Sequence, residues 1–359
     1  MFLFVVLQIC PCPASDPPLS RYEFREVHMG TQFRIVLYTP DEPAANAASR
    51  AAFDRIAQLD AMLSDYQPDS ELMQLCAKAG GPPVRVSDEL FFVLTRSQGL
   101  SNRSGGAFDV TVGPVVRLWR RARRQHKLPD PERLAQACEL VGYELVRLDD
   151  ESRTVQLMKP GMQLDLGGIA KGYAADEAMA VLKNHGVTRA LVAASGDIVV
   201  SSPPPDEAGW TIGIAPLGGD EKGVRNLFPG RPDRGIAEKV PDTFFVGEYL
   251  LLRDAAVSTS GDTEQFVEID GRRYSHIVDP KTGQALTERM HVTVVASKGI
   301  TSDSLATAVC VLGPERGLKL VDATGGAAAV FVRNTEQGPQ VLESSRYNGI
   351  PRGQPKRVE

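Results

Sequence analysis

The sequence is most informative in two stretches near its C-terminus, Tyr274-Ser-His-Ile-Val-Asp-Pro-Lys-Thr-Gly283 and Thr301-Ser-Asp-Ser-Leu-Ala-Thr307. The first is expected to be a strand over 274–278 that breaks into a turn, because a proline fixes one backbone angle there and a glycine permits a positive one. Side chains at the end of a strand are both exposed and fixed, which makes His276 and Asp279 candidates for function.

The second stretch is typical of the first turns of a helix. Asp303 and Thr307 are four residues apart, so they share one helix face and can direct two oxygen atoms to one point. Carboxylate and hydroxyl oxygens suit a hard cation such as Mg²⁺, which often also binds water and phosphate. With His276 nearby, the pair suggests metal-assisted phosphoryl chemistry. The alternative is a helix-start acid beside a threonine bonded to its own helix.

The composition is that of an ordinary globular protein. A chain of 359 residues can form one large domain or two closely joined ones. Its 42% hydrophobic and 24% charged residues are typical of soluble proteins. The net charge of −5 gives no reason to expect nucleic-acid binding.

The first residues differ from the rest of the chain. Residues 1–9 are apolar apart from Gln8 and precede Cys10-Pro-Cys-Pro-Ala14. This run is too short to span a bilayer and resembles the core of a secretory signal, although it lacks a positively charged start. Leu7-Gln-Ile-Cys10 also resembles a lipoprotein box. We therefore expect a signal-like or linker segment over 1–19, and an exported protein that is periplasmic or anchored in the membrane through its N-terminus.

Periodicity predicts strands and helices along the remaining chain. A segment rich in Gly, Pro and charge, residues 217–241, is expected to be an insertion loop, and residues 334–359 a loosely ordered C-terminal tail. Helices are expected over 43–63, 88–99, 132–141 and 314–323, from Pro114, after Gly168 and around Asp303. Strands are expected over 21–27, 32–38, 145–148, 154–157, 190–194, 198–200, 210–215, 244–252, 266–269, 273–277, 291–296 and 327–332.

Two loops lead into helices in a way that suits an anion. One is the loop over 105–114, and the other is Leu164-Asp-Leu-Gly-Gly-Ile-Ala-Lys171. The patterns of a P-loop and of a dinucleotide-binding Rossmann unit are both absent from the sequence. A lysine in the first helical turn is unfavourable, so Lys171 indicates an anionic ligand nearby. The basic run from Arg117 to Lys127 is interpreted as a solvated face.

Taken together, these stretches resemble the ApbE family of FAD:protein FMN transferases. Each piece alone is weak, but the set is collinear and covers roughly residues 20–333. The residues that carry the resemblance are Met29-Gly30-Thr31; Tyr66 with Pro68-Asp-Ser-Glu-Leu72; Phe108-Asp109-Val-Thr111-Val-Gly-Pro114; Asp165-Leu-Gly-Gly-Ile-Ala-Lys171-Gly172; Ser195-Gly196-Asp197-Ile198; Ser258-Thr-Ser260-Gly261-Asp262; His276-Ile-Val-Asp279-Pro280-x-Thr282-Gly283; and Thr301-x-Asp303-x-x-x-Thr307.

The resemblance implies a fold and an activity. The fold would be α+β, with a mixed core of antiparallel sheets and packed helices like that of T-fold proteins, in a flavin transferase domain over 20–333. The activity would be cleavage of FAD with a divalent metal, Mg²⁺. FMN would pass through a phosphoester to a Ser or Thr of an acceptor flavoprotein subunit, and AMP would be released.

The resemblance also assigns residue roles. Asp303 and Thr307 would be metal ligands, with the backbone carbonyl near Gly168 completing the set. His276 would be the base that deprotonates the acceptor hydroxyl. The sequence departs from the family at Ser195, where the family more often has glycine. The FAD site would be formed by Met29, Tyr66, Asp109, Thr111, Lys171, Ser195, Gly196, Asp197, Ser260, Gly261, His276 and Asp279.

Two other functions remain open at this point. Water can replace the acceptor hydroxyl, which would make the protein an Mg²⁺-dependent FAD pyrophosphatase that releases FMN and AMP. A non-catalytic FAD-binding protein is the other alternative, although His276 and Asp303 are both present. Nothing in the sequence identifies the acceptor.

Overall fold

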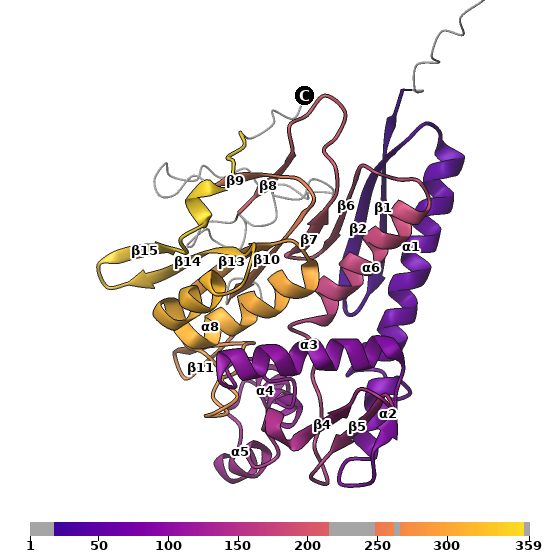
Figure 1. Ribbon diagram of the computed structural model, residues 1–359. Coiled ribbons are helices and arrows are strands. Elements are labelled where there is room, and N and C mark those ends of the chain that lie inside the picture. Colours follow the sequence, from indigo (N-terminus) through magenta and orange to yellow (C-terminus); the bar gives the residue numbers. More distant parts are fainter. Residues whose placement is uncertain (1–17, 215–247, 262–265, 355–359) are drawn as a thin grey trace, which may run out of the picture.

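The computed structural model describes residues 18–214, 248–261 and 266–354. Its centre is an eight-stranded sheet in the order β1-β2-β6-β7-β10-β13-β14-β15, in which every neighbouring pair is antiparallel (Figure 1). The strands are β1 (Ser20–His28), β2 (Thr31–Thr39), β6 (Ala190–Ala194), β7 (Asp197–Val200), β10 (Ala255–Gly261), β13 (Met290–Ala296), β14 (Ala328–Thr335) and β15 (Gly338–Glu343).

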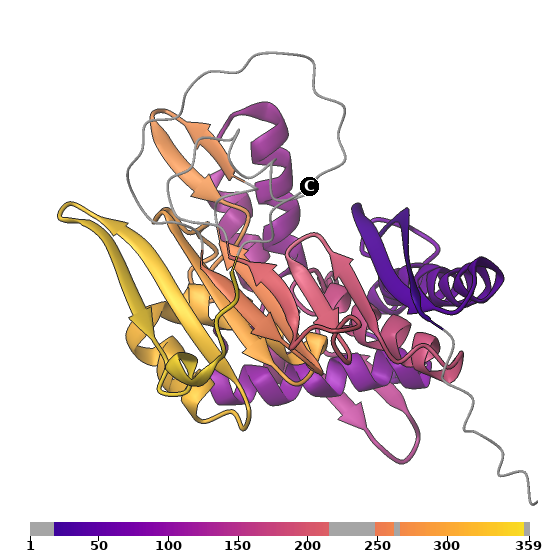
Figure 2. The same cartoon turned by 90° about the horizontal axis from the view of Figure 1, so that it is seen from above.

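Both faces of this sheet pack against a hydrophobic core. Successive side chains along a strand point to opposite faces, so a strand can contribute to both cores. On β13, Val292 and Val294 belong to the core that also contains the long helices, whereas Val295 belongs to a core on the opposite face. The opposite face is covered by a two-stranded sheet of β8 (Trp210–Gly213) and β9 (Tyr249–Leu252). Figure 2 shows the strands of the main sheet side by side.

Three long helices pack against the first face: α1 (Glu42–Leu63), α6 (Ala170–Asn184) and α8 (Gly299–Asp322). The starts of α6 and α8 touch, and a Cβ on Gly172 would lie only 2.1 Å from the carbonyl oxygen of Gly299. Asp176 of α6 also accepts hydrogen bonds from the backbone N–H groups of Gly299 and Ile300, at 2.8 and 3.0 Å. These contacts fix the first turn of α8 against the first turn of α6.

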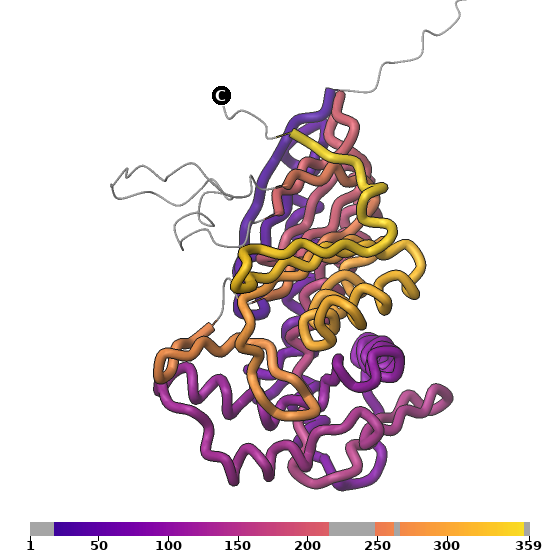
Figure 3. The backbone as a smooth tube through the Cα atoms, turned by 90° about the vertical axis from the view of Figure 1, so that its left-hand side faces the viewer, coloured from indigo at the N-terminus to yellow at the C-terminus, as the bar shows by residue number. Residues whose placement is uncertain are grey.

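A second layer lies below the main sheet in Figure 1. Figure 3 shows the β11–β12 hairpin beside helices α4 and α5, and their side chains share a separate hydrophobic cluster. The elements of this layer are α2 (Glu71–Ala77), β3 (Val84–Arg85), α3 (Asp88–Ser104), α4 (Gly113–Gln125), α5 (Pro131–Cys138), β4 (Val146–Asp149), β5 (Thr154–Leu157), β11 (Phe266–Ile269) and β12 (Arg272–Ser275).

The α+β fold with antiparallel sheets is confirmed, but the C-terminal part differs from the expectation. Strand β14 runs through the boundary placed after residue 333, and β15 pairs with it, so this segment extends the main sheet. Tyr347 is fully buried and donates a hydrogen bond to Glu248 at 2.7 Å. The expected helix over 314–323 is present as the second part of α8. It follows the helix of Asp303 after a break at Gly313, whose φ of 72° and ψ of 176° are not helical.

Three other expectations fall partly or wholly outside the described residues. The insertion loop over 217–241 lies outside them, as do most of the N-terminal segment over 1–19 and the start of the strand expected over 244–252. Within the described ranges, no helix is long and apolar enough to cross a membrane.

Candidate active site

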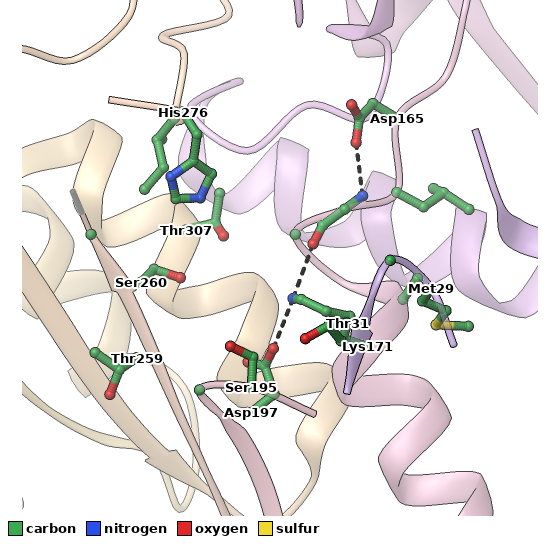
Figure 4. A pocket seen from close by; sticks show the side chains of 18 of the residues that line it. Met29, Thr31, Asp165, Lys171, Ser195, Asp197, Thr259, Ser260, His276 and Thr307 are labelled. Carbon is green, nitrogen blue, oxygen red and sulfur yellow. Dashed lines mark hydrogen bonds and ion pairs between the residues drawn. The ribbon is translucent and has the colours of Figure 1, made fainter. Parts of the chain in front are cut away.

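A cleft of about 860 Å³ opens at one edge of the main sheet. The β1–β2 turn at Met29, the β6–β7 turn at Ser195 and the end of β10 at Ser260 all reach this edge and line the cleft. The first turn of α6 and one face of α4 complete the walls. A cleft of this size is suited to a ligand as large as a dinucleotide, and Figure 4 shows its side chains.

The predicted site residues are largely brought together here. Thr111, Asp279 and Asp303 do not line the cleft but lie behind residues that do. The predicted residues that line it are Met29, Tyr66, Asp109, Gly168, Lys171, Ser195, Gly196, Asp197, Ser260, Gly261, His276 and Thr307.

The most concentrated charge lies at the start of α6. The Lys171 Nζ is 2.7 Å from Asp197 Oδ2 and donates a hydrogen bond to the Gly167 carbonyl at 3.2 Å (Figure 4). It is also 3.7 Å from Asp303 Oδ2. Burial opposes the charge of this ammonium, but the two carboxylates outweigh burial and raise its pKa. When both carboxylates are ionised, the group has one negative charge in excess, which favours a cation beside it.

Asp303 is held at the back of this group. The residue is 2% exposed, and its Oδ2 accepts a hydrogen bond from the Gly172 N–H at 3.0 Å. Burial raises the pKa of Asp303 and the charge of Asp197 adds to the effect, while Lys171 opposes both. A cation near this carboxylate would favour its ionised form.

The donors proposed for a metal fit a hard cation. A Cβ on Gly168 would lie 3.0 Å from Thr307 Oγ1, so the absence of a side chain at residue 168 keeps the space beside this hydroxyl open. The Thr307 hydroxyl has no hydrogen-bond partner among the described residues. No group of three or more His, Cys, Asp or Glu suited to a metal occurs in the described part of the chain. One carboxylate, one hydroxyl and a carbonyl suit a site where Mg²⁺ also keeps water and phosphate ligands.

His276 follows directly after β12, and its ring lies on the same side of the cleft as Thr307 and Ser260 in Figure 4. Asp279 has a different place from the one predicted. Its Oδ1 accepts a hydrogen bond from the Lys281 N–H at 2.9 Å and its Oδ2 one from the Thr282 hydroxyl at 3.2 Å. Its carboxylate therefore stabilises the turn that follows His276.

Thr111 also has a supporting place. It is fully buried, and both its N–H and its hydroxyl donate to Asp109 Oδ1, at 2.8 and 2.7 Å. Its hydroxyl oxygen in turn accepts a hydrogen bond from the Gly142 N–H at 2.8 Å. Burial raises the pKa of Asp109, and the two hydrogen bonds from Thr111 oppose that effect. Asp109 lines the cleft and Thr111 holds it in place.

The backbone at Ser195 shows why glycine suits this position. This residue has φ of +56° in the β6–β7 turn, a region that glycine enters at no steric cost and other residues enter rarely. Gly261 meets a closer constraint, because a Cβ there would lie 2.4 Å from the carbonyl oxygen of Met290 on β13. Both positions are at the cleft edge of the sheet.

Arg120 is the main lining residue that sequence reasoning missed. Its side chain is 15% exposed and forms ion pairs with Asp65 and with Asp165, the latter at 2.8 Å. Its guanidinium also lies 4.2 Å from the centre of the Tyr66 ring. Arg120 belongs to the run interpreted as a solvated face. Its spacing of four residues from Val116 was the available signal, since Val116 is apolar and also lines the cleft.

Comparisons with known proteins agree with this geometry. The model of the ApbE family matches residues 29–331. A FAD:protein FMN transferase of Treponema pallidum (strain Nichols) is 35% identical over 330 residues, which cover 88% of this chain and 85% of that protein. One from Vibrio cholerae serotype O1 is 30% identical and covers 92% of this chain and 93% of its own length.

Solved structures of flavin transferases are also similar to this chain. The apo form of the flavinyl transferase ApbE of Pseudomonas stutzeri matches with a TM-score of 0.77 at 28% identity, over 94% of this chain and 98% of that one. A flavin transferase ApbE from Vibrio cholerae matches with a TM-score of 0.77 at 26% identity, over 93% of this chain and 100% of that one.

Proposed function

The chain belongs to the ApbE family, and from this membership and the geometry of its cleft we propose that it transfers FMN from FAD to an acceptor protein. The acceptor hydroxyl, of a Ser or a Thr, attacks the phosphorus on the FMN side of the pyrophosphate. The bond from that phosphorus to the oxygen of the AMP phosphate breaks, and AMP leaves. The product is a phosphoester between FMN and the protein.

One observation carries this proposal. Lys171, Thr307 and His276 come from three distant segments and line one cleft, with Asp303 directly behind Lys171. Attack on a pyrophosphate builds negative charge on phosphate oxygens, and the Lys171 ammonium supports that charge. The acceptor hydroxyl is a weak nucleophile at neutral pH, and the imidazole of His276 takes its proton as the new bond forms.

We propose Mg²⁺ as the metal, bound by Asp303, Thr307 and the backbone carbonyl near Gly168. When bound, it would add positive charge beside the phosphate oxygens that become more negative in the transition state. The excess negative charge around Lys171 and the open space beside the Thr307 hydroxyl support this assignment.

The two walls of the cleft suggest how FAD would bind. Arg120 and the exposed ring of Tyr66 lie at one wall, where a flat ring system can stack against them. The β6–β7 turn and the start of α6 lie at the other, beside Lys171. We therefore expect the pyrophosphate near Lys171.

The experiment follows AMP by chromatography, with FAD and Mg²⁺, in the presence and absence of an acceptor protein that has an exposed Ser or Thr flavinylation site. The proposal predicts AMP in a one-to-one ratio with modified acceptor and little AMP without acceptor. Equal AMP and free FMN release in both reactions would instead show a pyrophosphatase. Intact FAD in both reactions would show that the protein binds FAD without cleaving it, at least with the acceptor tested.

We also propose that the protein acts outside the cytoplasm, either in the periplasm or anchored to the membrane facing it. The proposal depends on the apolar run and Cys10 near the start of the sequence. Sequencing the N-terminus of the mature protein from separated cell fractions tests it. An unprocessed chain in the cytoplasmic fraction would contradict it.

A further inference from the structure

Helix α4 has two functional faces. Val116, Arg120 and Arg123 line the cleft from one side of the helix. Val115, Trp119 and Ala122 are buried on another side, in the cluster that includes Tyr274 and Val278. The spacings of three and four residues within each set place each set on its own face. The two sets are offset by one residue, about 100° around the helix, so α4 contacts the cleft with one face and the hairpin of His276 with the neighbouring face.

Trp119 makes a polar contact from this buried face. It is 2% exposed, and its Nε1–H donates a hydrogen bond to the carbonyl oxygen of Gly283 at 2.8 Å. Its ring also packs on Tyr274 of β12, with ring centres 5.2 Å apart and planes inclined at 32°. Gly283 is buried, so its carbonyl would lose a partner that water does not readily replace.

Gly283 belongs to the turn that fixes His276. The Gly283 N–H donates to the Asp279 carbonyl at 2.9 Å, and the Asp279 N–H donates to the Gln284 carbonyl at 2.9 Å. The Leu286 N–H then donates to the Ile277 carbonyl at 2.9 Å. Because these bonds tie the turn into one unit, holding the Gly283 carbonyl against α4 also holds the backbone on either side of His276.

We propose that Trp119 is a positioning residue for His276. Its indole N–H fastens the tip of the turn to α4, and α4 in turn forms a wall of the cleft where FAD is expected. Trp119 does not line the cleft itself. The inference rests on the proposed function, in which His276 takes the proton of the acceptor hydroxyl. A displacement of about 1 Å at such a group lowers rates by about a hundredfold.

The chain provides a matched control in its other tryptophan. Trp210 is also buried, at 7% exposed, and its Nε1–H donates to the Ser202 carbonyl at 3.0 Å. Trp210 packs in the cluster on the far face of the main sheet. Changing either residue to Phe removes one indole and one hydrogen bond, so the two variants lose similar stability.

The test measures FAD affinity, transfer rate constant and unfolding free energy for Trp119→Phe and Trp210→Phe. We expect Trp119→Phe to lower the rate constant about ten- to a hundredfold with FAD affinity unchanged. Trp210→Phe should stay within about twofold of the wild type. Equal rate losses in the two variants, or a loss of FAD affinity matching the loss of rate, would overturn the proposal.

A double-mutant cycle with His276→Ala separates this inference from the proposed function. If Trp119 acts through His276, Trp119→Phe should have no further effect on the residual rate of His276→Ala. Independent, multiplying losses would show that Trp119 acts on something else. A normal rate in His276→Ala alone would instead refute the role of His276 in the proposed function.

Discussion

Lys171 and Asp303 lie where two helices cross against the main sheet, whereas His276 lies on a turn of a separate layer. The first pair is held by the close contact of Gly172 with Gly299 and by the Asp176 cap at the start of α8. The turn of His276 is held by its own hydrogen bonds and by Trp119. In the proposed function, charge stabilisation would therefore be provided by the core of the fold, and proton transfer by a turn attached to that core.

This difference predicts two kinds of variant. Changes at the helix crossing should affect charge, metal dependence and folding together, because the same backbone contacts serve all three. Changes around the turn should affect the transfer step alone. The following predictions test the helix crossing and then the sheet on which it packs, from the largest expected effect to the smallest.

Asp303→Ala should cause the largest loss. It removes the buried carboxylate beside Lys171, and the loss of a metal's charge stabilisation is worth several kcal/mol, or about a thousandfold in rate. The measurement is AMP release against Mg²⁺ concentration, with Asp303→Asn as the variant of similar shape. Full Mg²⁺-dependent activity in Asp303→Ala would remove this residue from the metal site.

Gly172→Ala should destabilise the fold by about 3 kcal/mol, because the new Cβ would overlap the Gly299 carbonyl. Gly99 in α3 is the control. A Cβ there meets no atom within 4 Å, and Ala is favoured over Gly in a helix by about 1 kcal/mol. Urea unfolding of both variants measures the difference. Equal stability in the two variants would show that α6 and α8 can move apart to accommodate the new Cβ without loss of stability.

His291 should make the sheet sensitive to acid. Burial lowers the pKa of this β13 histidine to about 4 from 6.5, and its Nδ1 has no hydrogen-bond partner among the described residues. Between these pH values the unfolded chain binds a proton that the folded one does not, so stability falls as pH falls.

Between about pH 7 and about pH 5, the free energy of unfolding should fall by about 2 kcal/mol more for the wild type than for His291→Gln. Urea unfolding at both pH values measures it, and the exposed His126, changed to Gln, is the surface control. An identical pH dependence in the wild type and His291→Gln would contradict the prediction.

Much of the fold could be predicted from local patterns. The β1–β2 hairpin, α1, α6 and the central strands follow the periods of two and 3.6 that their side chains show. The strand β15 was missed because it follows a predicted strand closely and lies near the end of the sequence. Its pairing depends on the exposed edge of β14, which no local pattern reveals.

The site was predictable where its residues form ordered motifs and not where they depend on distant partners. Lys171, His276 and Thr307 stand in recognisable stretches. Arg120 is identified only by Asp65 and Asp165, which lie 55 and 45 residues away in sequence and meet it in the fold. Thr111 and Asp279 carry the right residue types, but only the structure shows that they support their neighbours.

The most direct test of the account is the intact mass of an acceptor protein after incubation with enzyme, FAD and Mg²⁺. The proposed function predicts a gain equal to FMN less one water on a single Ser or Thr, which disappears with His276→Ala while that variant still binds FAD. An unmodified acceptor beside free FMN, or an unchanged gain with His276→Ala, would contradict it.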